Sequence, residues 1–275
     1  MCLVGMVHLG NGEYIAFKNR DLQYQPDVDV PRFLAKTQEP CLVFPVGEGE
    51  GEGIWAGVNR SGVSFQFSDI YVSDHRTLSD SAVEEARRFF RVFHQDALQE
   101  CRSASDAVMK FIDLYQSGSI VKRLRQIMLV CGRDTGAIVE IGDEQVGIEW
   151  LDEHGYLIRS NWPVVLGVRA PQGEAQQPLH ISAKLRAQRA IELIEQSDDW
   201  GVECAKRLLC DEKYGKTGMS ICRHSRQKGY RTTSSVIVHV MKNRACCYYN
   251  LEGPPCGAGF REKKLPQCNG GRETC

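Results

Sequence analysis

A cysteine at position 2 and a short polar run ending at Asp21 carry the residue types of a covalent acyl-transfer site. If Met1 is removed, Cys2 offers a thiol nucleophile and a free α-amino group on one residue. The ordinary pKa of an α-amine, about 7.7 to 8.0, leaves part of it neutral near pH 7, so it can act as a general base. These groups suit an acyl transfer in which the thiol attacks a carbonyl carbon and forms a thioester. The alternative is an ordinary buried cysteine in the first strand, since cysteine packs as a small apolar residue.

The residues between positions 2 and 21 predict a hairpin. Residues 2–9 read as a strand, the Asn-Gly pair at 11–12 is a strong two-residue turn signal, and residues 13–17 read as the returning strand. The hairpin brings the KNRD segment at 18–21 back beside Cys2. An aspartate there can accept hydrogen bonds from the terminal ammonium, and a nearby cation favours the thiolate.

Composition narrows the class of partner. The chain has 275 residues, 42% of them hydrophobic and 25% charged, with a net charge of −1. This charge predicts no general attraction to nucleic acid or to an anionic membrane, so a small-molecule substrate is expected. The sequence has no apolar run of membrane-spanning length and no positive region ahead of its first apolar stretch, so we expect a cytoplasmic protein. The sequence leaves open whether the protein forms a homo-oligomer.

Short strand patterns alternate with two pairs of helices after the hairpin. Because hairpins dominate, we expect α+β architecture with mainly antiparallel sheets and helices packed outside them. A single domain over 1–275 is expected, with a Cys-rich tail from about residue 253. The Gly- and Glu-rich segment 47–53 predicts a solvated loop, a candidate lid, since its carboxylates would repel a phosphate. The predicted strands are 41–46, 54–58, 63–67, 126–131, 137–141, 146–151, 156–160, 234–241 and 245–251, and the predicted helices are 79–98, 103–114, 182–196 and 202–212.

Other chemistry is less clearly indicated. Five of the twelve cysteines fall in the last thirty residues, so a zinc site in the tail is an alternative, although no Cys-x-x-Cys pair occurs. Of the seven histidines, His224 lies beside Arg223 and His239 lies in an apolar strand, and none forms an evident catalytic pair. We therefore expect no cofactor and no metal.

Five motifs follow one another in order: MCLVG, KNRD, WAGVNRSGV, RSNWP, and SICRH followed by TTSSVIV. On these motifs the chain resembles the acyl-coenzyme A:6-aminopenicillanic-acid acyltransferase-like family, N-terminal nucleophile hydrolases related to choloylglycine hydrolase and penicillin V acylase. The resemblance runs from Cys2 to about Cys256. It implies a four-layer αββα sandwich, and an N-terminal cysteine amide hydrolase or acyltransferase that forms a thioester on Cys2 and cleaves or makes a small non-peptide amide.

The resemblance also implies roles for three residues that match positions of the family's motifs. Asp21 matches the aspartate that orients the nucleophile's amine, and Arg223 matches a late arginine. Asn161 matches an asparagine that donates to the oxyanion of the tetrahedral intermediate. Without the resemblance, the favoured interpretation of Asn161 is an ordinary turn residue at a strand end.

Two positions depart from the family pattern. The choloylglycine hydrolases have arginine where this chain has Lys18, so either Lys18 or Arg20 would supply that cation. Asp69 falls where those enzymes often carry a second oxyanion asparagine. A carboxylate opposes an oxyanion, so Asp69 either points elsewhere or recognises a cationic part of the substrate.

Two non-enzymatic alternatives remain open at this point. The MC start and the NRD triplet are also typical of a family linked to secretory organisation, although its NRDE motif is broken here by Leu22. The other alternative is a Cys-rich metal-binding protein.

Overall fold

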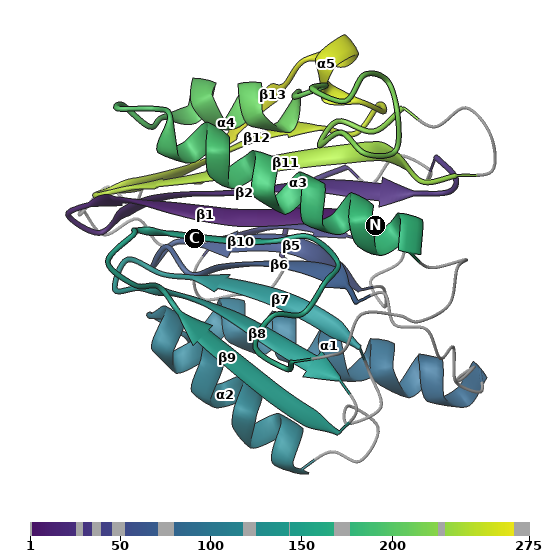
Figure 1. Cartoon of the computed structure of the whole chain (residues 1–275). Helices are drawn as coiled ribbons and strands as arrows, with labels where there is room; N and C mark the ends of the chain where they lie inside the picture. Colours follow the sequence, from purple (N-terminus) through teal and green to yellow (C-terminus); the bar gives the residue numbers. More distant parts are fainter. Residues whose placement is uncertain are drawn as a thin grey trace.

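Two β-sheets lie face to face between two layers of helices (Figure 1). The computed structural model describes residues 2–25, 30–34, 40–45, 53–70, 80–117, 125–142, 144–167, 177–224 and 229–266. In this part of the chain, helices α3 and α4 cover the first sheet and helices α1 and α2 cover the second. The predicted α+β sandwich is confirmed.

The described strands form a six-stranded and a seven-stranded sheet, and every pairing is antiparallel. The first sheet has the order β10 (Tyr156–Arg159), β1 (Cys2–Gly10), β2 (Glu13–Leu22), β11 (Arg231–Met241), β12 (Arg244–Asn250) and β13 (Arg261–Lys264). The second has the order β3 (Arg32–Phe33), β4 (Cys41–Pro45), β5 (Ile54–Asn59), β6 (Ser64–Asp69), β7 (Gln126–Cys131), β8 (Gly136–Gly142) and β9 (Gln145–Trp150). The helices are α1 (Asp80–Glu100), α2 (Ala104–Ser117), α3 (Gln177–Glu195), α4 (Val202–Leu209) and α5 (Pro255–Ala258).

The first hairpin forms as its sequence predicts. Asn11 and Gly12 have φ angles of 52° and 73°, and a two-residue turn with both central residues at positive φ matches the twist of the strands it joins. Strand β2 continues beyond the predicted end at residue 17, so the KNRD segment is part of the strand. Its polar residues stay extended because they pair with β1 on one side and β11 on the other.

Side chains of β1 and β2 alternate between two buried layers. Val4, Met6 and Ala16 belong to the core between the two sheets, whereas Leu3 and Phe17 belong to the core under α3 and α4. Since successive residues of a strand point to opposite faces, the even-numbered residues of these strands face the second sheet. The odd-numbered residues face the helices. This alternation decides which polar residues can meet near Cys2.

Several boundaries differ from the prediction. Helix α3 begins at Gln177 instead of residue 182, and α4 ends at Leu209 instead of residue 212. The sequence also did not predict β3, β13 and the short helix α5. Strand β13 has the sequence REKK, which has no apolar pattern, and it is extended because its backbone pairs with β12. Residues 47–52 of the predicted loop and residue 79, the expected start of a helix, lie outside the described residues.

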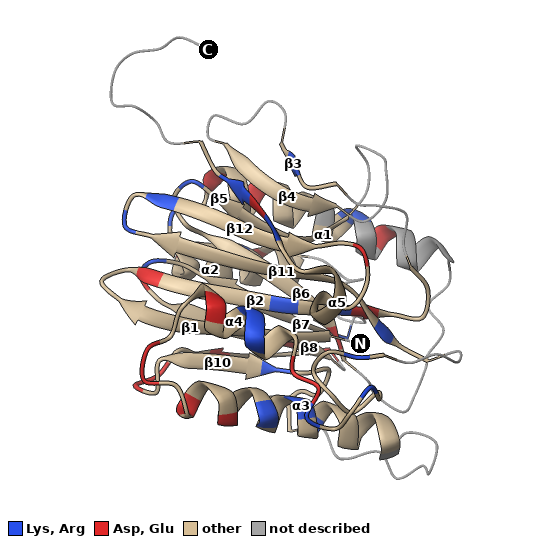
Figure 2. Ribbon diagram, turned by 90° about the horizontal axis from the view of Figure 1, so that it is seen from above, with Lys and Arg blue, Asp and Glu red and all other residues tan. Residues whose placement is uncertain are grey.

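Charges of both signs lie on the outer helix α3, as Figure 2 shows. This mixture agrees with the net charge of −1. Among the described residues, no helix combines the length and the apolarity that crossing a membrane requires.

Candidate active site

Cys2 is the first residue of β1, and two consecutive residues after β10 hold its backbone. Its amide nitrogen donates to Asn161 Oδ1 at 2.6 Å, and Ser160 Oγ donates to the carbonyl oxygen of Cys2 at 3.2 Å. The side chain is 7% exposed and, as an even-numbered residue, lies on the face toward the second sheet. The position of the Cys2 nitrogen is therefore set by Asn161. Met1 lies outside the described residues.

Asn161 connects Cys2 to both sheets. It has a φ of 51°, in the left-handed region that asparagine tolerates better than most residues. Its Nδ2 donates to Ser68 Oγ at 3.0 Å and to the Asp69 carbonyl oxygen at 2.7 Å. Its Oδ1 accepts from the Cys2 nitrogen and from Arg186 Nη2, the latter at 3.2 Å. Rotating the amide by 180° would place donors against donors, so these four partners determine its orientation.

This arrangement gives Asn161 a different task from the one expected. An asparagine amide has two N–H donors, and here both are directed to Ser68 and Asp69. The atom directed at Cys2 is the acceptor Oδ1. In this structure Asn161 holds the nitrogen of Cys2, and its expected role as a donor to the oxyanion stays a prediction.

Asp21 lies fully buried on the helix-facing side of β2, between two arginines. Its Oδ2 is 3.3 Å from Arg186 Nη1 and 3.6 Å from Arg223 Nη1, and its Oδ1 accepts from Thr232 Oγ1 at 2.9 Å. Strand pairing supplies the Thr232 contact directly, because residues 21 and 232 are register partners. The two guanidinium groups offset the cost of burying this carboxylate.

Arg186 is a candidate site residue that the sequence analysis did not select. It lies on α3 with 0% exposure and joins Asp21 to Asn161, using Nη1 for the first and Nη2 for the second. A signal was present: Arg186 occupies the helical stripe formed by Ala183, Ala190 and Ile194, all of which are buried. A charged residue at an apolar position of a helix needs a buried partner.

Lys18 and Arg20 lie on the same face of the first sheet as Cys2. Arg20 is the register partner of Cys2, and Lys18 is one diagonal step away. Lys18 Nζ donates to the Phe67 carbonyl oxygen in β6. The Trp55 ring lies close to both cations, with its centroid 5.3 Å from the Arg20 guanidinium carbon and 5.8 Å from Lys18 Nζ. Both candidate cations thus lie on the face of the sheet that carries Cys2, with Arg20 as its register partner.

Asp69 contributes its backbone to this arrangement and leaves its side chain exposed. Its carbonyl oxygen accepts from Asn161, at the end of β6 where the second sheet meets the end of the first. The seven residues selected from the sequence therefore gather at one end of the sandwich. They are Cys2, Lys18, Arg20, Asp21, Asp69, Asn161 and Arg223.

A buried carboxylate fixes the loop after Asn161. Glu140 on β8 accepts from Arg159 Nε at 2.7 Å and from the backbone N–H groups of Val164 and Val165 at 2.8 Å and 2.7 Å. Because Arg159 and Val164 lie on either side of Asn161 in the chain, Glu140 restrains the backbone around it. The sequence analysis did not select Glu140, whose partners lie 19 to 26 residues away.

His224 lies in a cluster of side chains apart from the site around Cys2. It belongs to no pair with the site around Cys2, yet it lies among Glu212, Cys222 and Cys256. The other histidine discussed above, His239, is half-buried in β11.

Comparisons with known proteins support the fold. No protein-family model and no curated protein matches the chain. Two solved structures of conjugated bile acid hydrolase variants from Clostridium perfringens are similar to it. One has a TM-score of 0.57 and 12% sequence identity over 97% of each chain. The other has a TM-score of 0.56 and 13% identity over 98% of this chain and 97% of that one. At such identity the likeness establishes the shared sandwich, and the acyltransferase-like family stays a prediction.

Proposed function

We propose that this protein is an N-terminal cysteine amide hydrolase or acyltransferase that acts on a small non-peptide amide. The observation that carries the proposal is the 2.6 Å contact between the Cys2 nitrogen and Asn161 Oδ1. Once Met1 is removed, this nitrogen is an amine, and Asn161 keeps it beside the thiol of the same residue. Arg186 links Asn161 to Asp21, so the position of the base depends on three buried side chains.

The reaction proceeds in two acyl-transfer steps. The amine accepts the thiol proton, the thiolate attacks the amide carbonyl carbon, and the resulting tetrahedral intermediate expels the substrate's amine, which receives the proton. A thioester on Cys2 remains. Water or an acceptor amine then attacks the thioester carbonyl and releases the thiol. Arg20 and Lys18, on the face of Cys2, stabilise the negative charge on sulfur and on the developing oxyanion.

The substrate class follows from the charges at the site. The exposed carboxylate of Asp69 is suited to a cationic group of the substrate, and the net charge of the chain gives no reason to expect nucleic acid or membrane partners. The structural neighbours are hydrolases of conjugated bile acids, which supports a small-molecule amide over a peptide bond. We propose that the acyl group is attached to Cys2 whether the final acceptor is water or an amine.

The test blocks the amine and leaves the thiol unchanged. A short peptide that cannot be trimmed is fused ahead of Cys2, and the same peptide fused to the C-terminus is the matched control. Because general-base assistance is worth about 100- to 10,000-fold, turnover of acyl amides should fall by that factor at an unchanged melting temperature. Intact mass spectrometry of the unblocked protein should show loss of Met1 and an acyl adduct, both checked against Cys2→Ala.

Two results would overturn the proposal. One is full amidase activity in the N-terminally extended protein. The other is an acyl adduct that persists in Cys2→Ala, which would assign the nucleophile to an internal thiol.

A further inference from the structure

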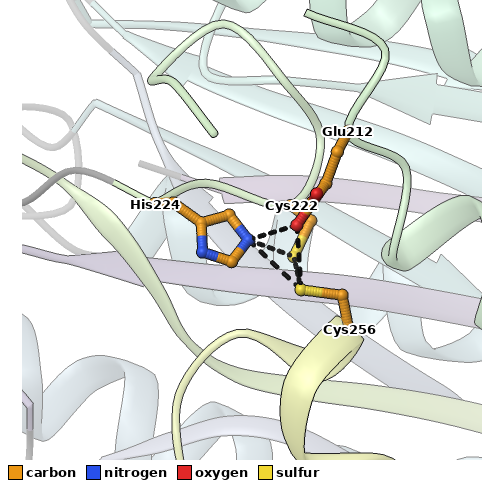
Figure 3. Close-up of side chains that lie close together, drawn as sticks. All are labelled: Glu212, Cys222, His224 and Cys256. Atoms are coloured by element: carbon orange, nitrogen blue, oxygen red, sulfur yellow. Dashed lines mark hydrogen bonds and ion pairs between the residues drawn. The ribbon is translucent and has the colours of Figure 1, made fainter. Parts of the chain in front are cut away.

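Four side chains with metal-binding atoms converge on one point apart from the site around Cys2 (Figure 3). Glu212, Cys222 and His224 come from the segment between α4 and β11, and Cys256 comes from α5. Cys222 is buried, and Cys256 is exposed. Figure 3 shows the two sulfur atoms, the imidazole and the carboxylate all pointing toward the same small volume.

The distances among the four atoms are close to, and in part slightly shorter than, those of a tetrahedral ion site. His224 Nε2 lies 2.6 Å from Glu212 Oε1, 3.2 Å from Cys256 Sγ and 3.4 Å from Cys222 Sγ. Cys256 Sγ lies 3.0 Å from Glu212 Oε1 and 3.4 Å from Cys222 Sγ. Ligand bonds of zinc imply ligand-to-ligand distances of about 3.3 to 3.8 Å in a tetrahedron. A small expansion of this cluster would therefore accommodate the ion.

The histidine decides between a metal site and a cysteine nucleophile. In a Cys-His-acid triad the acid binds one ring nitrogen and the nucleophile binds the other. Here a single nitrogen, Nε2 of His224, faces Glu212 and both thiols. One nitrogen cannot donate to the carboxylate and accept from a thiol together. Its lone pair can, however, point to an ion at the centre of the three groups.

A disulfide accounts for the cluster less well. The sulfur atoms of Cys222 and Cys256 are 3.4 Å apart, whereas a disulfide bond is about 2.05 Å long, and both thiols are free. A disulfide would also leave the convergence of Glu212 and His224 on the same point without a purpose.

We propose that Glu212, Cys222, His224 and Cys256 form a structural zinc site. Two thiolates and an imidazole select a borderline-soft ion over Mg²⁺ or Ca²⁺, which prefer oxygen ligands. Binding releases the protons of the two thiols, and no redox step is involved. Four protein ligands complete a tetrahedron, so the site has no open position for substrate. Its role is to join α5 to the segment that leads into β11.

The position of Arg223 gives the zinc site a link to the site around Cys2. Arg223 lies between two of the ligands in the chain, and its carbonyl oxygen accepts from the Thr232 nitrogen at 3.1 Å. Its Nη1 is 3.6 Å from Asp21 Oδ2. Zinc would therefore fix the backbone on both sides of Arg223 and hold its guanidinium against Asp21. This link, unlike the zinc site itself, rests on the proposed function.

The test measures metal on the full chain, independently of activity. Protein purified under reducing conditions should contain about one zinc ion per chain by elemental analysis. After chelation, added Co²⁺ should produce the absorption of a tetrahedral cobalt–thiolate centre. Cys256→Ser is the deciding variant because Cys256 is exposed on a short helix, and it should weaken zinc binding by more than the roughly 10- to 100-fold cost of losing an outer-sphere partner. Cys204→Ser, at a half-exposed thiol of α4 outside the cluster, is the matched control and should retain zinc.

Three outcomes would overturn the zinc site. The first is the absence of zinc and of a cobalt–thiolate signal in wild-type protein. The second is unchanged zinc binding in Cys256→Ser together with its loss in a Cys268→Ser/Cys275→Ser variant, which would assign the ion to the last two cysteines of the chain. The third is a Cys222–Cys256 disulfide in non-reduced peptide maps of protein purified without reductant. The two proposals can fail separately. If zinc content depends on Cys256 but wild type is as inactive toward acyl amides as Cys2→Ala, the zinc site stands and only the proposed function is rejected.

Discussion

The two helix-on-sheet interfaces of the sandwich differ in how each buries a titratable side chain. Under α3 and α4, Arg186, Asp21 and Asn19 are fully buried, and each has defined partners; Asn19 Nδ2, for example, donates to the carbonyl oxygens of Leu209 and Ile221 at 2.9 Å and 3.0 Å. Under α1, the imidazole of His94 is buried among aromatic rings. Neither of its ring nitrogens has a hydrogen-bond partner within the described residues.

The aromatic environment of His94 indicates a packing role. The centroid of its ring lies 4.5 Å from that of Phe65 and 4.2 Å from that of Phe67, with Phe90 and Phe93 farther out at 5.7 Å. Burial lowers the pKa of His94 well below its ordinary value, so the ring is neutral in the folded protein. The interface under α1 therefore uses a histidine as an aromatic filler.

The two interfaces differ in what their buried polar groups do: those under α3 position other residues, and His94 of α1 fills space. Replacing buried ion pairs by apolar groups is often neutral or stabilising, so a partnered charge network is weak evidence of stability alone. The network under α3 leads from Asp21 through Arg186 and Asn161 to the nitrogen of Cys2. We infer that it is retained for geometry, whereas the aromatic cluster contributes cohesion.

The strongest test of this comparison removes one large side chain from each interface. Arg186→Met leaves a buried charge without one of its partners and should lower the free energy of unfolding by about 3 to 5 kcal/mol. Phe93→Ala should cost a similar amount through the cavity it leaves. Turnover at a temperature where both variants are folded should fall only in Arg186→Met. In denaturant titrations, Asp21→Asn combined with Arg186→Met should cost less than the sum of the two single changes.

A matched asparagine pair sharpens the same comparison. Asn161→Ala should reduce turnover about 100-fold, because a misplaced catalytic group costs on that order, and should lower stability by about 1 to 3 kcal/mol. Asn59 is the control: it is buried beside α1 and binds the Leu98 and Cys101 carbonyl oxygens and the Val63 nitrogen. Asn59→Ala should match the stability loss and keep normal turnover. Equal turnover in the two variants would return Asn161 to a structural role.

The smallest expected effect concerns pH. Below about pH 6.5 the unfolded chain protonates His94 and the folded protein does not, so the free energy of unfolding falls by up to about 1.4 kcal/mol per pH unit until the folded pKa is reached. Above about pH 6.5 both states hold a neutral His94, so its contribution to the free energy of unfolding does not change with pH. His94→Phe should therefore differ from wild type more at pH 5.5 than at pH 7.5 in urea titrations. His154→Gln, at an exposed histidine, is the control and should leave the wild-type pH dependence unchanged. If the free energy of unfolding of His94→Phe and of wild type changed with pH in the same way, the buried neutral ring would be contradicted.

Local features of the fold were predictable because they depend on neighbours in the chain. The Asn-Gly turn at 11–12 and the alternation in residues 2–9 produce the hairpin, and its register places Arg20 across from Cys2. Polar strands were harder to predict. The extension of β2 through Asp21 and the strand β13 depend on backbone pairing with β11 and β12, which leaves no apolar pattern in the sequence.

By itself, the sequence determined the hairpin, the antiparallel sheets and the candidate residues Cys2 and Asp21. Only the tertiary structure decided what holds them. Asn161 is 159 residues from Cys2, and Arg186 is 165 residues from Asp21. The same is true of Cys256, which approaches Cys222 across 34 residues. Such contacts form when whole layers pack and buried charges must find partners, and no local pattern encodes which partner a buried charge will meet.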